Sequence, residues 1–316
     1  MRRVFLRSLP DWRRSDGYTL CFMMLSNLKK RLIISGNLIT AFLFLLVFDH
    51  YLTEAQTGFY FILAVFSSLC FYEFTKLYGN INIKLPWQFP VVTGLCGIII
   101  IWMLWTFPRT ILRLNVGAYL QLIMWDMPML ASFVIFIIVA IVYYLKKRIT
   151  DFSNIIILSA GFVYVYLPIW SIARMRAQGV MLVIYFVALV KITDSIAYFW
   201  GTRFGKHKLA EHISPNKTVE GFIAGLIGAS FIGMGIFYLI LPATITRLTP
   251  FWLIFIINFV IVFVAQIGDL LESYIKRTCK VKDSGQLLGP LGGILDLADS
   301  LLLAAPPAAY LLLKLC

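Results

Sequence analysis

Charged residues are scarce in this chain, and acidic residues most of all. Only 14% of the 316 residues are charged and 15 are Asp or Glu, whereas 60% are hydrophobic. The mean hydropathy is +0.86. A soluble domain of this size carries far more charge, and no polar stretch is long enough to fold separately in water. The composition therefore excludes a soluble globular protein and predicts an all-α, polytopic integral membrane protein.

Cysteine and histidine are also few. The five cysteines are scattered, and no two of them have CxxC or zinc-ligand spacing. Most lie in or beside apolar segments, where a thiol behaves as a small hydrophobic group. The three histidines form no cluster. These patterns argue against a disulfide framework and against a His-rich metal site.

Positive charge is in excess, with a net charge of +13. In a membrane protein the simplest cause is the accumulation of Lys and Arg in cytoplasmic loops, so we expect no nucleic-acid partner. Anionic lipid head groups or anionic substrates could use the same charge.

Apolar runs long enough to cross a membrane predict about nine transmembrane helices. They are 32–48, 58–75, 90–107, 129–145, 154–170, 180–200, 221–241, 251–267 and 300–315. The last run contains Pro306 and Pro307, so we expect it to be kinked or only partly inserted.

The loops between these runs indicate the topology. With the N-terminus in the cytoplasm, 21 basic residues fall in inside segments and five in outside loops, among them Arg174 and Arg176. This asymmetry favours that orientation. It places the two charge-rich loops, 202–220 and 268–299, on the cytoplasmic side.

The chain divides into a basic N-terminal arm, 1–31, and a membrane domain, 32–316, whose catalytic half is 191–303. The arm lacks the continuous apolar core of a signal peptide. It is either a membrane-surface arm or an artefact of a start codon placed upstream of Met23 or Met24.

Ionisable residues within the apolar runs are the first functional candidates. Lys191 and Asp194 are three residues apart, so they share a helix face. Such groups are costly at membrane depth and usually face a polar cavity, although an ion pair that ties helices together is the structural alternative. Asp269, Glu272 and Lys276 repeat this pattern where the eighth run reaches the cytoplasm.

The segment 201–221 is typical of a phosphate-binding loop. Glycines allow tight turns, and Arg203, Lys206, Lys208 and Lys217 surround the sequence SPNKT, which contains Ser214 and Asn216. Ordinary positive-inside charge is the alternative explanation. His207 and His212 are better explained as solvated surface residues than as ligands.

The segment 268–302 concentrates carboxylates. Asp296 and Asp299 lie on one face at the start of a helix, and Asp269 ends the preceding run. Carboxylates that converge repel one another unless a cation lies between them, and oxygen ligands near phosphates are typical of Mg²⁺. A helix cap explains one of the aspartates but not the whole set. Lys276, Arg277, Lys280 and Lys282 are placed to hold a polyphosphate.

At these residues the chain resembles the phosphatidate cytidylyltransferases, or CDP-diacylglycerol synthases. The resemblance covers 191–303 closely, and the first half only as a set of spans. In the later segment it rests on Ser273, Lys276-Arg277, Lys282-Asp283, Gly285, Leu288, Gly292-Gly293, Asp296 and Asp299. In the earlier one it rests on Asp194-Ser195, Ala197-Tyr198, Gly201, Gly205-Lys206, Ser214 to Thr218 and Glu220-Gly221.

Two positions depart from the family signature. Leu291 stands where the family has His before the glycine pair, and Leu297 stands where it has Arg after the first Asp. The first change removes a proton or phosphate partner, and the second removes a bidentate clamp for phosphate or carboxylate.

The resemblance implies transfer of CMP from CTP to phosphatidate, giving CDP-diacylglycerol and pyrophosphate. It implies Mg²⁺ as cofactor, with a second cation left open, a homodimer, and a multi-pass protein of the bacterial inner membrane with a cytoplasmic active site. The implied catalytic residues are Asp283, Lys282 and Asp299. The implied metal ligands are Asp269 and Asp296, and the implied substrate-binding residues are Lys191, Asp194, Ser214, Asn216, Lys217, Lys276 and Arg277.

Three alternatives remain open. Because Leu291 and Leu297 replace polar residues of the signature, the first alternative is a catalytically weakened family member that binds lipid or nucleotide without turnover. A CTP-dependent lipid kinase would use a similar site. A transporter would also contain intramembrane Asp and Lys, but its acidic residues should be spread through the membrane depth rather than gathered at one end of the late spans.

Overall fold

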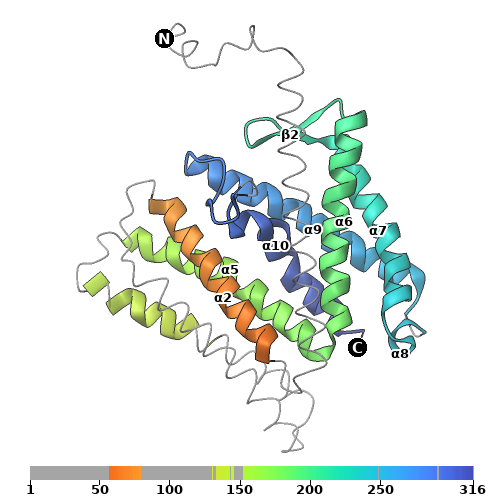
Figure 1. Ribbon diagram of the computed structural model, residues 1–316, viewed down its shortest axis with the longest axis horizontal. Helices are drawn as coiled ribbons and strands as arrows, with labels where there is room; N and C mark the ends of the chain where they lie inside the picture. Colours follow the sequence, from red (N-terminus) through yellow and green to blue (C-terminus); the bar gives the residue numbers. More distant parts are fainter. Residues whose placement is uncertain are drawn as a thin grey trace, which may run out of the picture.

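The computed structural model describes residues 57–79, 130, 133–142, 144–145, 152–247, 249–289 and 292–315. The described part is mostly helical (Figure 1). Its long helices are α2 (Thr57–Gly79), α5 (Phe152–Gln178), α6 (Val180–Phe204), α7 (Val219–Ile240), α9 (Phe251–Thr278) and α10 (Ile294–Leu313). A short helix, α8 (Ala243–Thr246), and two short strands, β1 (Lys208–Ala210) and β2 (Ser214–Thr218), complete it.

All six long helices are long and apolar enough to cross a membrane, which makes the chain a multi-pass membrane protein. Each coincides with a run predicted from the sequence. The runs 32–48 and 90–107 lie outside the described residues, and 129–145 is represented by a shorter apolar helix at Phe133–Val142. The count of nine helices therefore stays a prediction.

The helices extend beyond their predicted apolar runs at the charged ends. Helix α9 continues well beyond residue 267, and α10 begins at Ile294, in agreement with the helix start expected at Asp296 and Asp299. Helix α5 continues to Gln178, so Arg174 and Arg176 belong to a helix rather than to the predicted outside loop, and Arg176 is only 1% exposed. Basic residues in a last helical turn interact favourably with the helix dipole, so hydropathy alone ends such helices too early. Helix α10 also continues through Pro306 and Pro307.

Helix α10 lies at the centre of the described helices (Figure 1). It packs mainly on α9 and α5 and also contacts α2 and α6, while α6 packs along α7. Its buried residues include Ala304, Ala305, Ala308 and Ala309, and such small side chains let neighbouring helices approach closely. The start of α10 is thereby placed within reach of several other helices.

A β-hairpin interrupts the helical architecture where the sequence predicted only a loop. Strands β1 and β2 pair antiparallel between α6 and α7 (Figure 1). The Thr218 hydroxyl caps α7 by accepting from the Gly221 amide at 3.2 Å. The Glu220 carboxylate accepts from the Lys206 and His207 amides at 3.0–3.2 Å and contacts the His207 ring at 2.7 Å. These contacts fasten the hairpin to the first turn of α7.

Candidate functional site

The connection between α9 and α10 begins and ends at unusual backbone positions. Lys280 has φ 57° and follows the last turn of α9, where the Val281 amide donates to the Lys276 carbonyl at 3.0 Å. Gly289 and Gly292 have φ 57° and 88°, values that favour glycine. The prediction that the helix is interrupted over this segment and that a new helix follows is confirmed, although α9 ends at Thr278, before the first glycine of the segment.

A glycine brings α9 against α10. A Cβ at Gly268 would lie 2.9 Å from Leu303 Cβ and 3.0 Å from the Asp299 carbonyl oxygen, closer than real side chains pack. The next residue, Asp269, is half-buried on α9. Asp299 is near enough for the charges of Asp269, Asp194 and Lys191 to act on it. The structure therefore brings together three of the carboxylates predicted from the sequence.

Two contacts join the hairpin to α9. Lys217 on β2 forms an ion pair with Asp269, with 2.6 Å between Nζ and Oδ2. The Arg277 Nε donates to the Ile213 carbonyl at 3.2 Å. The two charge-rich segments, far apart in sequence, thus form one site. In this arrangement Arg277 supports the hairpin turn.

The pair Lys191 and Asp194 connects α6 with α10. The Lys191 ammonium lies 3.3 Å from the Asp194 carboxylate and donates to the Leu297 carbonyl at 3.4 Å. The Ser300 hydroxyl donates to Asp194 at 3.3 Å. Both charged side chains are about one-third exposed, at 34% and 37%. The pair ties two helices together, as the structural alternative supposed, and still borders an accessible space.

Asp296 is embedded in contacts with its surroundings. The Lys276 ammonium lies 2.8 Å from Asp296 and 2.5 Å from Glu272, a carboxylate that is only 1% exposed. Asp296 also accepts from the Gly293 amide at 2.7 Å and the Ser284 amide at 2.9 Å. The contact with the Gly293 amide is one half of a capping box at the N-terminus of α10, because the N-cap Gly293 has no side chain to form the reciprocal bond. Asp296 thus occupies the capping role that sequence reasoning had weighed as an alternative.

Glu73 on α2 was missed by the sequence analysis. Its carboxylate is 1% exposed, accepts from the Ser284 hydroxyl at 3.0 Å and accepts from the Leu295 amide at 2.9 Å. A helix from the first half of the chain therefore holds the loop and the first turn of α10. A signal was available, because Glu73 is a lone carboxylate within the run 58–75, and intramembrane carboxylates usually have a specific partner.

The remaining candidates lie at the periphery of this cluster. Asn216, Lys282 and Asp283 are exposed, and Ser214 is half-buried on β2. Leu297 is half-buried on α10, whereas Leu291 lies outside the described residues.

The donor groups can be compared with the needs of Mg²⁺. Within the part of the chain that the structure describes, no three His, Cys, Asp or Glu side chains gather as a metal-binding group. However, Mg²⁺ is commonly held by one or two carboxylates together with substrate phosphates. Asp269 and Asp299 fit that pattern. Asp296 fits less well, because both of its oxygens already accept hydrogen bonds.

Together these features define a class: a multi-pass helical membrane protein with paired cations and carboxylates gathered where α6, α9, α10 and a hairpin meet. Comparison with known families makes the class specific. A model of the cytidylyltransferase family matches residues 29–316. The chain therefore belongs to the cytidylyltransferase family.

Curated relatives in the genus Staphylococcus match about half of the chain. A phosphatidate cytidylyltransferase of Staphylococcus saprophyticus subsp. saprophyticus is 39% identical over 159 residues, and one of Staphylococcus haemolyticus is 38% identical over 159 residues. One of Staphylococcus aureus is 36% identical over 154 residues. Each match covers 49% of this chain and 55% of the relative. The chain thus spans about half the length of the curated relatives it matches.

Proposed function

We propose that this protein transfers CMP from CTP to phosphatidate, forming CDP-diacylglycerol and pyrophosphate. The observation that carries the proposal is the 2.6 Å pair of Lys217 and Asp269, which joins the two segments that resemble the family. The staphylococcal relatives, which are phosphatidate cytidylyltransferases, support the same reaction. In this proposal 191–303 is the catalytic half of a membrane domain that begins at residue 32.

The lipid phosphate is already an anionic nucleophile near neutral pH, so the reaction does not depend on a strong protein base. The chief difficulty is to bring two anions together and to stabilise the leaving pyrophosphate. Lys217, Lys276 and Lys282 are the ammonium groups we assign to phosphates, and Arg277 supports the hairpin from which Lys217 projects. Lys191 and Asp194 border the space assigned to the lipid head group.

Further roles are assigned to the loop and the hairpin. Ser214 and Asn216 on β2 would contact the nucleotide. Asp283 follows Lys282 directly in the exposed loop, so it would orient either the Lys282 side chain or the nucleotide. These three assignments rest on the family resemblance.

We assign Mg²⁺ to Asp269 and Asp299. When bound, the ion would neutralise phosphate charge and favour departure of pyrophosphate. Asp296 was the other ligand expected from the sequence, and it would join the ion only by exchanging a present partner such as Lys276.

The orientation and assembly belong to the same proposal. The site lies at helix ends where basic residues gather, so the positive-inside rule favours a cytoplasmic active site, and the bacterial relatives favour the bacterial inner membrane. Lipid would then enter from the cytoplasmic leaflet and CTP from the cytosol. A homodimer is expected from the family resemblance, and light scattering of the purified protein measures it.

The test uses the purified full chain in detergent with phosphatidate, Mg²⁺ and CTP labelled in the cytidine ring. The proposal expects label in the lipid fraction and its loss with EDTA. A parallel reaction with γ-labelled CTP expects no label in lipid, and label there would identify a lipid kinase instead. If folded, monodisperse protein transferred no cytidine, the alternative of a weakened binding protein would replace the proposal. In that case, the paired reversions Leu291→His and Leu297→Arg would show whether the two departures cause the loss.

A further inference from the structure

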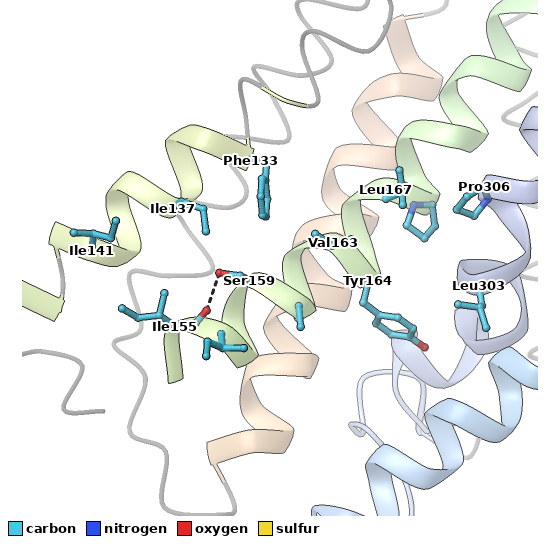
Figure 2. Close-up of a pocket in the computed structure, with 13 residues that line it drawn as sticks. Phe133, Ile137, Ile141, Ile155, Ser159, Val163, Tyr164, Leu167, Leu303 and Pro306 are labelled. Carbon is cyan, nitrogen blue, oxygen red and sulfur yellow. Dashed lines mark hydrogen bonds between the residues drawn. The ribbon is translucent and has the colours of Figure 1, made fainter. Parts of the chain in front are cut away.

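An apolar groove opens between α5, α10 and the helix at Phe133–Val142. Its volume is about 770 Å³ and its lining is almost wholly apolar. Figure 2 shows Phe133 and Ile137 on one side, Val163 and Tyr164 on α5, and Leu303 on α10. Sites that enclose small molecules commonly measure about 300–1,000 Å³, so the groove is large enough for a lipid chain. Because α5 and α10 are candidate spans, the groove between them lies at membrane depth.

One face of α10 connects this groove with the candidate site. Leu303 and Pro306 line the groove, and Asp299 precedes them by four and seven residues. Residues at this spacing lie on one side of an α-helix. The groove therefore extends along α10 away from the carboxylate cluster. A lipid whose head group lies at Asp299 would direct its chain along this face toward the membrane interior.

Tyr164 stands where the apolar and polar regions meet. Its ring lines the groove beside Leu303 (Figure 2). Its hydroxyl is buried, has no hydrogen-bond partner among the described residues, and is near enough to feel the charges of Glu272, Asp299 and Asp269. A buried hydroxyl without a partner is costly, whereas an ester carbonyl of a lipid would satisfy it.

We propose that this groove holds one acyl chain of the phosphatidate substrate, with the ester region next to Tyr164 and the phosphate near Asp299. The inference rests on the proposed function. The groove then acts as a specificity site that recognises chain length, and it fixes the lipid phosphate relative to CTP. Bulk membrane lipid and a second copy of this chain are the competing occupants.

The kinetic test fills the groove. Ala160 lines it and is exposed, so Ala160→Trp adds bulk inside the groove. Ile227→Trp places the same side chain on an exposed position of α7, outside the groove, and is the matched control. We expect Ala160→Trp to lower kcat/KM for dioleoyl phosphatidate about tenfold, the loss expected when roughly two methylene groups leave an apolar site. Dioctanoyl phosphatidate should be much less affected, and the KM for CTP should not change.

Equal losses on both lipids, or the same loss in Ile227→Trp, would overturn the proposal. A second measurement avoids dependence on a folded variant and on turnover. Wild-type protein in nanodiscs is labelled with phosphatidate that carries a photoreactive group on its acyl chain. We expect labelled peptides from α5 and α10, and competition by unlabelled phosphatidate but not by phosphatidylcholine.

The outcomes of labelling separate the two proposals. Equal labelling by a phosphatidylcholine probe would mean bulk lipid and overturn the groove assignment. Absent labelling, with disulfide cross-linking of Ala160→Cys between two copies, would mean that a second copy covers the groove and would also overturn it. Specific labelling without cytidine transfer would support the groove and contradict the proposed reaction. Cytidine transfer without labelling of α5 and α10 would support the proposed reaction and contradict the groove assignment.

Discussion

At the scale of single residues, the structure separates aspartates that the sequence treated alike. Asp296 and Asp299 share a helix face, and both were expected near a cation. Asp296 instead caps α10 and accepts from Lys276 at 2.8 Å, whereas Asp299 lies within range of the charges of Asp269 and of the Lys191–Asp194 pair. Similar positions in a motif thus correspond to different physical roles.

This difference predicts different defects for two matched substitutions. Asp296→Asn weakens the cap and the contact with Lys276, so it should lower the free energy of unfolding by about 1 kcal/mol, within the range for helix caps. Asp299→Asn removes no cap, so it should abolish turnover with little change in the melting temperature. Cytidine transfer and thermal unfolding in detergent measure both. Full activity in Asp299→Asn would contradict its assignment to Mg²⁺.

Glu73 predicts an effect of the first half of the chain on the site. Glu73→Ala leaves the buried Leu295 amide without its acceptor, which costs about 1–3 kcal/mol of folding free energy. Glu73→Gln keeps an acceptor oxygen and should be milder. We expect at least a tenfold fall in kcat for Glu73→Ala, partial recovery in Glu73→Gln, and an unchanged KM for CTP.

One result would contradict the proposal that Glu73 positions the loop before α10. A Glu73→Ala protein with wild-type kcat and melting temperature would mean that the loop keeps its shape without this carboxylate.

At the scale of helices, the close approach of α9 and α10 sets the distance between Asp269 and Asp299. Gly268 allows this approach. Gly268→Ala inserts a Cβ into tight contact with Leu303 and the Asp299 carbonyl. Such overpacking typically costs about 1–3 kcal/mol. We expect a lower melting temperature together with reduced turnover.

Gly235→Ala on α7 is the matched control, because a Cβ there meets nothing within 4 Å. It should leave activity unchanged and stabilise slightly through helix propensity. If Gly268→Ala behaved like this control, the two helices would have room to separate without consequence.

At the scale of the whole molecule, topology follows from where charge gathers. The loop with the exposed Lys282 and the exposed Arg247 near α8 lie beyond opposite ends of α9. In intact spheroplasts, a membrane-impermeant maleimide should label Arg247→Cys and spare Lys282→Cys until the membrane is opened. Labelling of the parent protein corrects for its own cysteines. The opposite pattern would place the candidate site outside the cytoplasm.

The sequence by itself determined the membrane class, the six spans that the structure describes and the two segments that form the site. These properties are local, because hydropathy decides whether a helix can lie in lipid and a spaced motif is visible along the chain. Only the tertiary structure decided that Lys217 meets Asp269, that Glu73 holds the loop before α10, and that a groove leads away from Asp299. Those contacts join residues far apart in sequence, and helix packing determines which of them meet.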